Sequence, residues 1–116
     1  MMKNIYIFFF IQMKIRKIED LNNIPEGITE LDISRLGLTT LPKLPQSLTT
    51  LYCSENQLTS LDIAHCYYLQ ELEVEYNNFP EEMVIILDDE DLTIQEKINK
   101  LIKGCLIPND NSYVLK

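Results

Sequence analysis

The sequence repeats itself at intervals of about twenty residues. In residues 48–68, apolar side chains recur with the spacing L-x-x-L-x-C-x-x-N-x-L, in which Asn56 is the polar member. Leu31 stands twenty positions before Leu51, and Leu72 stands twenty-one positions after it, each in the same local pattern. This period is a strong constraint on the fold, because a unit of twenty residues cannot bury its apolar side chains alone and must stack on its neighbours.

Four units in phase cover residues 8–80. Their boundaries are 8–27, 28–47, 48–68 and 69–80. The first unit is degenerate, with Arg16 where the pattern expects Asn, as is typical of a terminal unit. The spacing predicts parallel strands at Ile11–Met13, Leu31–Ile33, Leu51–Cys53 and Leu72–Val74. Residues 1–7 end in an alternating pattern of apolar residues, which is compatible with a further edge strand.

The connections between the strands are too short for full helices. In the second unit, Pro42 and Pro45 fix φ and remove backbone donors, which favours an extended, polyproline-like segment. The third unit has Leu61–Cys66 in that place and allows a short helical or 3-10 turn. We expect the amides of Asn56 and Asn77 to bond to the backbone of adjacent turns.

Residues 81–116 depart from the repeat. The apolar run at 81–87 fits either a strand or a buried helical turn. Thr93 and Glu96 form a capping box, and Gly104 offers a C′ stop, so we predict an amphipathic helix over 94–103 that covers the end of the repeats. Its apolar positions are Ile94, Ile98, Leu101, Ile102 and Cys105.

The segment LTTLPKLPQSLTTLYCSENQLTSL resembles the leucine-rich repeat family, in particular the short bacterial-effector-like type with twenty to twenty-one residues per repeat. Repeats in giant DNA viruses of amoebae look similar. The resemblance implies an α/β solenoid with a short curved parallel sheet, extended or 3-10 return legs, and a concave strand face that binds proteins. Some such effectors carry a separate ubiquitin-ligase domain with a catalytic Cys, but Cys105 has no matching motif here and ligase activity is not expected.

The repeat register assigns polar side chains to the concave face in three columns. The first unit would contribute Phe10, Gln12 and Lys14. The later units would contribute Glu30, Asp32, Ser34, Thr50, Tyr52, Ser54, Glu71, Glu73 and Glu75. We expect Tyr52 to be an exposed aromatic anchor and the carboxylates to steer a basic partner. The alternative is that these charges are only a solvated strand face.

The charge balance bears on the class of partner. Acidic residues outnumber basic ones by 18 to 10, giving a net charge of −8. This argues against nucleic acid and anionic membranes as partners, and it favours a protein partner with a basic surface. The three cysteines imply no disulfide framework, so we expect an intracellular, cytoplasmic protein, in a host cell if the chain is viral or effector-derived.

The N-terminal apolar run at 5–11 imitates a short signal peptide. It lacks an A-x-A-like cleavage site, because Ala64 is the only alanine, and it passes directly into the first repeat. The run is also shorter than the ~20 apolar residues that cross a bilayer. We therefore expect neither secretion nor membrane insertion.

No pattern of catalytic or metal-ligating residues stands out. His65 beside Cys66 invites a zinc site, but zinc needs three or four ligands and only Cys53 offers a third. Since no nucleophile with an orienting carboxylate accompanies His65, we expect no enzyme activity, metal or cofactor. The alternative to partner binding is a scaffolding protein that self-associates through apolar ends, including Phe8 and Phe10.

Overall fold

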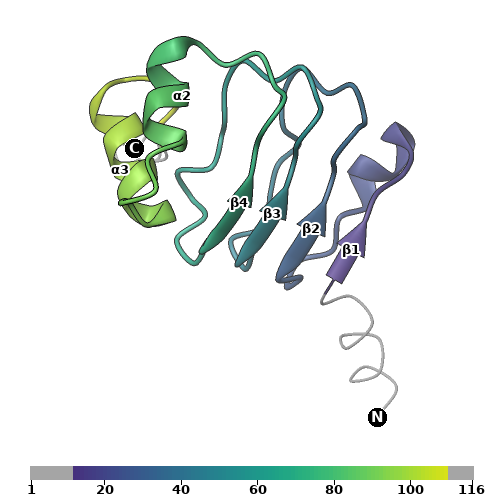
Figure 1. Cartoon of the computed structure of the whole chain (residues 1–116). Coiled ribbons are helices and arrows are strands. Elements are labelled where there is room, and N and C mark those ends of the chain that lie inside the picture. Colours follow the sequence, from purple (N-terminus) through teal and green to yellow (C-terminus); the bar gives the residue numbers. More distant parts are fainter. Residues whose placement is uncertain (1–11, 110–116) are drawn as a thin grey trace.

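The computed structural model describes residues 12–109 and contains a parallel sheet of four strands followed by two α-helices (Figure 1). The strands lie in sequence order as β1 (Gln12–Lys14), β2 (Glu30–Asp32), β3 (Thr50–Tyr52) and β4 (Glu71–Glu73). The protein is therefore an α/β protein with an open sheet. The predicted edge segment 1–7, and the apolar side chains Phe8 and Phe10, lie outside the described residues.

The register of the last three strands follows the sequence period. Leu31 pairs with Leu51, and Leu51 pairs with Leu72. The predicted alignment of these three residues as stacked neighbours is confirmed. Backbone hydrogen bonds continue the ladder beyond the strands, with the Ile33 amide donating to the Tyr52 carbonyl over 2.8 Å. Strand pairing thus places equivalent residues of successive units opposite one another.

The predicted register of the first strand is wrong by two residues. Met13, and not Ile11, pairs with Leu31, and the Ile15 amide donates to the Asp32 carbonyl over 2.9 Å. Ile15 is buried accordingly, at 2% exposure. A shift of two residues keeps the same side chains on the same face, because strand side chains alternate with a period of two. The apolar pattern therefore could not distinguish the two registers.

The core consists of the side chains that alternate with the polar strand residues. Leu31 and Leu51 are fully buried, whereas Met13 and Leu72, on the outer strands, are half-buried. This alternation is typical of a sheet with one covered face. Buried side chains from the connections and helices complete the core. They include Ile28, Leu48, Leu58, Leu61, Ile63, Leu69, Met83, Leu87, Ile98 and Leu101.

The connections between strands are extended or tightly turned. A 3-10 helix, η1 (Ile18–Asn23), joins β1 to β2, and the segment with Pro42 and Pro45 between β2 and β3 contains no helix, as predicted. The third connection forms hydrogen-bonded turns, in which the Cys66 amide donates to the Ile63 carbonyl over 3.0 Å. The short connections keep consecutive strands adjacent.

The ambiguous segment after β4 is a helix, α2 (Glu81–Leu87). Pro80 precedes it with a φ of −57°, and Glu81 and Glu82 occupy its first turn, where negative charge stabilises the helix dipole. Met83 and Leu87, one helical turn apart, are buried against the core. Ile85, which lies between them and would share their face in a strand, is 67% exposed, as expected of a helix.

The second helix, α3 (Ile94–Lys103), has the predicted bounds and the predicted capping box. The Glu96 amide donates to the Thr93 hydroxyl over 3.1 Å, and the Thr93 amide donates to the Glu96 carboxylate over 2.8 Å. The Gln95 side-chain amide donates to the carbonyls of Cys66 and Leu69, at 3.0 and 2.9 Å. These bonds hold α3 beside the β4 end of the sheet (Figure 1).

The end of α3 differs from the prediction in two respects. Gly104 has a φ of −82°, and Cys105 is the residue in the left-handed conformation, with a φ of 58°. The Leu106 amide donates to the Leu101 carbonyl over 2.8 Å, which completes a Schellman motif with Cys105 at C′. The predicted core position of Cys105 is wrong, since this turn exposes its side chain.

Candidate functional site

One face of the sheet carries the polar strand residues, and we call it the polar sheet face. Its side chains stand in three rows that cross the strands, because successive strands are paired in register. The first row is Gln12, Glu30, Thr50 and Glu71; the second is Lys14, Asp32, Tyr52 and Glu73; the third, two residues further along each strand, is Arg16, Ser34, Ser54 and Glu75.

The shifted register of β1 changes which residues of the first unit belong to this face. Gln12 and Lys14 each lie one row earlier than predicted, Arg16 joins the third row, and Phe10 lies outside the described residues. Arg16 therefore does not occupy the expected Asn position. The opposite charges of Lys14 and Asp32 were the available signal, because such pairs favour directly opposed positions on neighbouring strands.

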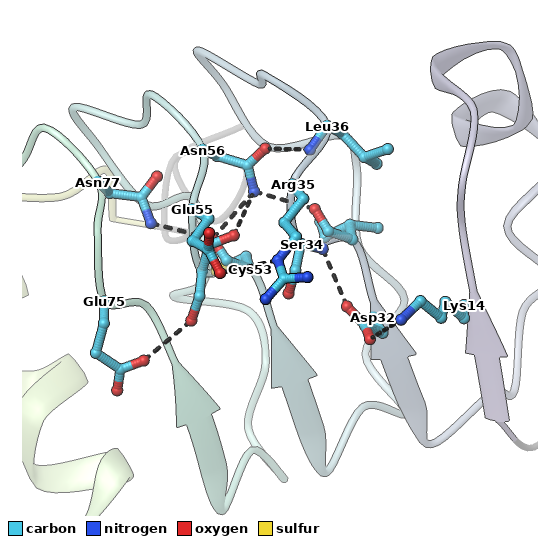
Figure 2. A network of polar contacts seen from close by, with 12 residues as sticks. Lys14, Asp32, Ser34, Arg35, Leu36, Cys53, Glu55, Asn56, Glu75 and Asn77 are labelled. Carbon is cyan, nitrogen blue, oxygen red and sulfur yellow. Dashed lines mark hydrogen bonds and ion pairs between the residues drawn. The ribbon is translucent and has the colours of Figure 1, made fainter.

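At the β1 end, Lys14 and Asp32 form an ion pair with 3.4 Å between Nζ and Oδ2 (Figure 2). The Ser34 amide donates to the other Asp32 oxygen over 3.0 Å. Partial burial raises the pKa of Asp32, but the Ser34 hydrogen bonds and the Lys14 charge together outweigh it, and the net pKa lies below its usual value of 3.8. Asp32 thus stays ionised and holds Lys14 on the face.

Three residues just beyond the strands share an unusual backbone conformation. Arg35, Glu55 and Tyr76 have φ values of 61°, 57° and 63°, in the left-handed region. Arg35 and Glu55 form an ion pair of 2.8 Å between Nε and Oε2. The sequence analysis missed these side chains, because nothing in the apolar spacing marks a left-handed turn at a residue that is not glycine.

The two asparagines that follow β3 and β4 bond to the backbone as predicted (Figure 2). The Asn56 Oδ1 accepts from the amides of Leu36 and Leu38, both at 3.0 Å. The Asn56 Nδ2 donates to the carbonyls of Ile33, Cys53 and Ser54. Asn77 makes a smaller set of the same kind, with its Oδ1 accepting from the Leu58 amide and its Nδ2 donating to the carbonyls of Cys53 and Val74.

The middle of the polar sheet face is less exposed than predicted. Thr50 is buried, at 9% exposure, because its short side chain lies between the longer Glu30 and Glu71 on the flanking strands. Tyr52 is half-buried and not fully exposed. Burial, together with the carboxylates of Glu71, Glu30 and Glu73, raises the pKa of Tyr52. Its hydroxyl makes only a long contact, of 3.5 Å, with Glu71.

The β4 end of the face is acidic. Glu71, Glu73 and Glu75 are all exposed, and the Ser54 hydroxyl donates to Glu75 over 3.0 Å. These three carboxylates, at alternating positions along β4 and just beyond it, are called the acidic row, which runs along the strand and not across the sheet. They reinforce one another's potential, which attracts cations to that edge. Each side chain is placed as the sequence predicted.

A hollow of about 520 Å³ lies over the face and extends from Lys14 on β1 to Glu73 on β4. Its charged lining residues are balanced, with Lys14, Arg16 and Arg35 against Asp32, Glu55 and Glu73. The polar sheet face thus changes from mixed charge near β1 to an excess of negative charge at β4. Such a gradient orients a charged partner along the rows.

Two of the three cysteines, Cys53 and Cys66, are buried, and Cys105 is exposed. Cys53 is fully buried, and burial, followed by the charge of Glu75, raises the pKa of its thiol to about 12. The His65 Nε2 lies 2.8 Å from the Leu44 carbonyl. Within residues 12–109, no three His, Cys, Asp or Glu side chains are grouped so as to hold a metal ion.

Comparisons of the chain with protein-family models, with curated proteins and with solved structures find no match. In the part of the chain that the structure describes, neither helix has the length and apolar content that crossing a membrane requires. The function must therefore be argued from the geometry of the polar sheet face itself.

Proposed function

We propose that the chain is a leucine-rich repeat solenoid that acts as a non-catalytic module for binding another protein. The partner presents a basic surface to the polar sheet face. Three features support the repeat assignment: the alignment of Leu31, Leu51 and Leu72, the repeated asparagine bonds, and the helices at the β4 end. In such an arrangement the strand face is the largest regular surface available to a partner.

The observation that carries the proposal is the position of Glu71, Glu73 and Glu75. All three are exposed, two on β4 and one just after it, at one end of a face whose cations lie at the other end. Exposed carboxylates in this arrangement contribute little to folding stability, and they repel one another. It does accelerate and orient association with a basic protein.

The test is affinity capture from cell lysate with the whole chain, followed by mass spectrometry. We expect the charge reversal E71K/E73K/E75K to reduce capture of basic partners by at least about tenfold, and high salt to weaken capture by the unmodified chain. The matched control E19K/E26K/E90K changes the net charge equally at exposed positions off the face. Equal capture by both triple variants would show a merely solvated charged face and would refute the proposal.

Self-association remains the second candidate because the β1 end has apolar surface. Met13 is half-buried and Ile18 is 57% exposed, in contrast with the buried leucines of the inner strands. If this surface joins copies of the chain, light scattering will show oligomers that grow with concentration and that Ile18→Lys abolishes. A monomer at all concentrations would exclude this candidate.

A further inference from the structure

An apolar groove lies beside the acidic end of the polar sheet face. It has a volume of about 270 Å³ and runs between the segment that follows β4 and helix α2. Val74, Phe79, Val84 and Leu87 line it. Small-molecule sites usually enclose about 300–1,000 Å³, so a groove of this size suits one or two side chains of a partner better than a whole cofactor.

Tyr76 lines this groove, and packing within the chain does not explain the exposure of its large side chain. Its side chain is 81% exposed, the highest value among the large apolar residues that the structure exposes, and its φ is 63°. A bulky side chain is disfavoured in the left-handed region, where glycine or asparagine would be accommodated more easily. Arg35 and Glu55 share this conformation and form an ion pair with each other. The aromatic side chain of Tyr76 instead lines an apolar groove.

The charge around the groove indicates what it would accept. Glu75 and Asp88 are among its lining residues, and the groove has no Lys or Arg in its lining. Glu73, the last residue of β4, stands two positions before Glu75 and belongs to the acidic row. An apolar cleft edged by carboxylates complements an apolar side chain that has a basic residue close to it in sequence.

We infer that this groove receives an aliphatic or aromatic side chain from the basic segment that binds the polar sheet face. The inference rests on the proposed function, and it adds a specificity site to it. The acidic row attracts the segment, Tyr76 and Val84 contact the apolar anchor, and Glu75 and Asp88 pair with the neighbouring cation. Partners without an apolar anchor beside their basic residues bind weakly.

The probe is a random peptide library displayed on phage and selected on the whole chain. We expect the enriched peptides to carry Leu, Ile, Phe or Trp close to Lys or Arg. One enriched peptide is then synthesised, and its dissociation constant is measured by fluorescence anisotropy for each variant. Tyr76→Asn and Val84→Glu should each weaken binding at least about tenfold, because each removes an apolar contact.

Two controls separate binding from folding. Ile85→Glu places the same charge on α2 at a position that is 67% exposed and does not line the groove, so the affinity should stay within about twofold. Tyr76→Asn should leave the urea unfolding midpoint unchanged or raised, because asparagine tolerates a positive φ. Weaker binding without weaker folding is a result that a purely structural Tyr76 would not give.

The remaining outcomes distinguish this inference from the proposed function. Peptide binding that is lost in E71K/E73K/E75K but kept in Tyr76→Asn and Val84→Glu would overturn the groove and leave the acidic face standing. Binding that is lost only in the groove variants would support the groove and refute the acidic face. Enriched peptides without an apolar residue, or no enrichment at all, would overturn the inference, as would self-association that Val84→Glu abolishes.

Discussion

The two ends of the sheet are built differently. At the β4 end, α2 and α3 bury Met83, Leu87 and Leu101 against the core, and Gln95 ties α3 to the preceding connection. At the β1 end, the 3-10 helix η1 contains no buried residue. Among residues 12–109, the sheet is thus well covered at its acidic end and thinly covered at its mixed-charge end.

Stability is therefore distributed unevenly along the stack of repeats. An inner strand is covered by a neighbour on each side, whereas an outer strand depends on whatever lies beyond it. At the β4 end, α2 and α3 cover the outer strand. The strand that carries the acidic row is therefore stably packed. We expect the β1 end to open first, and four sets of substitutions test this contrast.

The largest effect should come from the inner strands. Leu51→Ala removes a side chain with 0% exposure and should lower the free energy of unfolding by about 2–5 kcal/mol. Met13→Ala, at the half-buried equivalent on β1, should lower it by only about 1 kcal/mol. Urea unfolding of both variants measures the difference. Equal losses would mean that β1 is as firmly packed as the inner strands.

Replacing the asparagines should lower the free energy of unfolding by a smaller amount, and the loss should be greater at the inner Asn56 than at Asn77 near the edge. Asn56→Leu leaves buried backbone groups of the neighbouring turns without partners, and should lower the free energy of unfolding by about 1–3 kcal/mol. Asn77→Leu should cost less, because Asn77 is half-buried and water can replace its bonds. Thermal unfolding measures both, with the exposed Asn78→Leu as the control. An unchanged Asn56→Leu midpoint would contradict the structural role of this amide.

The turn after α3 offers a gain in stability at the covered end. Cys105 adopts a φ of 58°, which disfavours any side chain, so Cys105→Gly should raise the free energy of unfolding by about 0.5–1 kcal/mol. Gly104 needs no such freedom, and a Cβ there would approach no atom closer than 3.4 Å. Gly104→Ala should therefore be tolerated, or should raise the free energy of unfolding by up to about 1 kcal/mol, because alanine fits this backbone and restricts the unfolded chain. If Gly104→Ala instead destabilises the fold, as a side chain at a left-handed position would, the assignment of the left-handed position to Cys105 is wrong.

The smallest effect concerns the ion pair at the β1 end. Because the pKa of Asp32 is lower in the folded chain than its usual 3.8, ionised Asp32 contributes stability above that pH, and the contribution is lost as the pH falls through the folded value. Asp32→Asn should thus cost up to about 1 kcal/mol at neutral pH. Guanidinium unfolding at neutral pH and near pH 3, in both chains, tests this. A cost that grows on acidification would contradict the sign of the pKa shift.

Much of this structure could be predicted from local sequence. The alignment of Leu31, Leu51 and Leu72 followed from their spacing, and the bounds of α3 followed from Thr93 and Glu96, because a capping box acts within one helical turn. The backbone bonds of Asn56 and Asn77 followed from their place after each strand. These features depend on residues that are near one another in sequence or repeat in phase.

The errors arose where several arrangements satisfy the same local pattern. The register of β1 could shift by two residues without moving an apolar side chain to the other face. Thr50 was placed on the correct face, but its burial depends on the length of side chains from two other strands. Cys105 fitted the helical spacing, yet the helix ends at Lys103 and the chain turns at Cys105 itself.

The sequence by itself determined the period, the face to which each strand residue points and the helix at 94–103, because these depend on the alternation of apolar residues and on caps within a few positions. Only the tertiary structure decided the β1 register, the helical form of 81–87 and the groove beside Tyr76. Each of those depends on contacts between units, which form where strands and helices meet and leave no mark in the spacing along one segment.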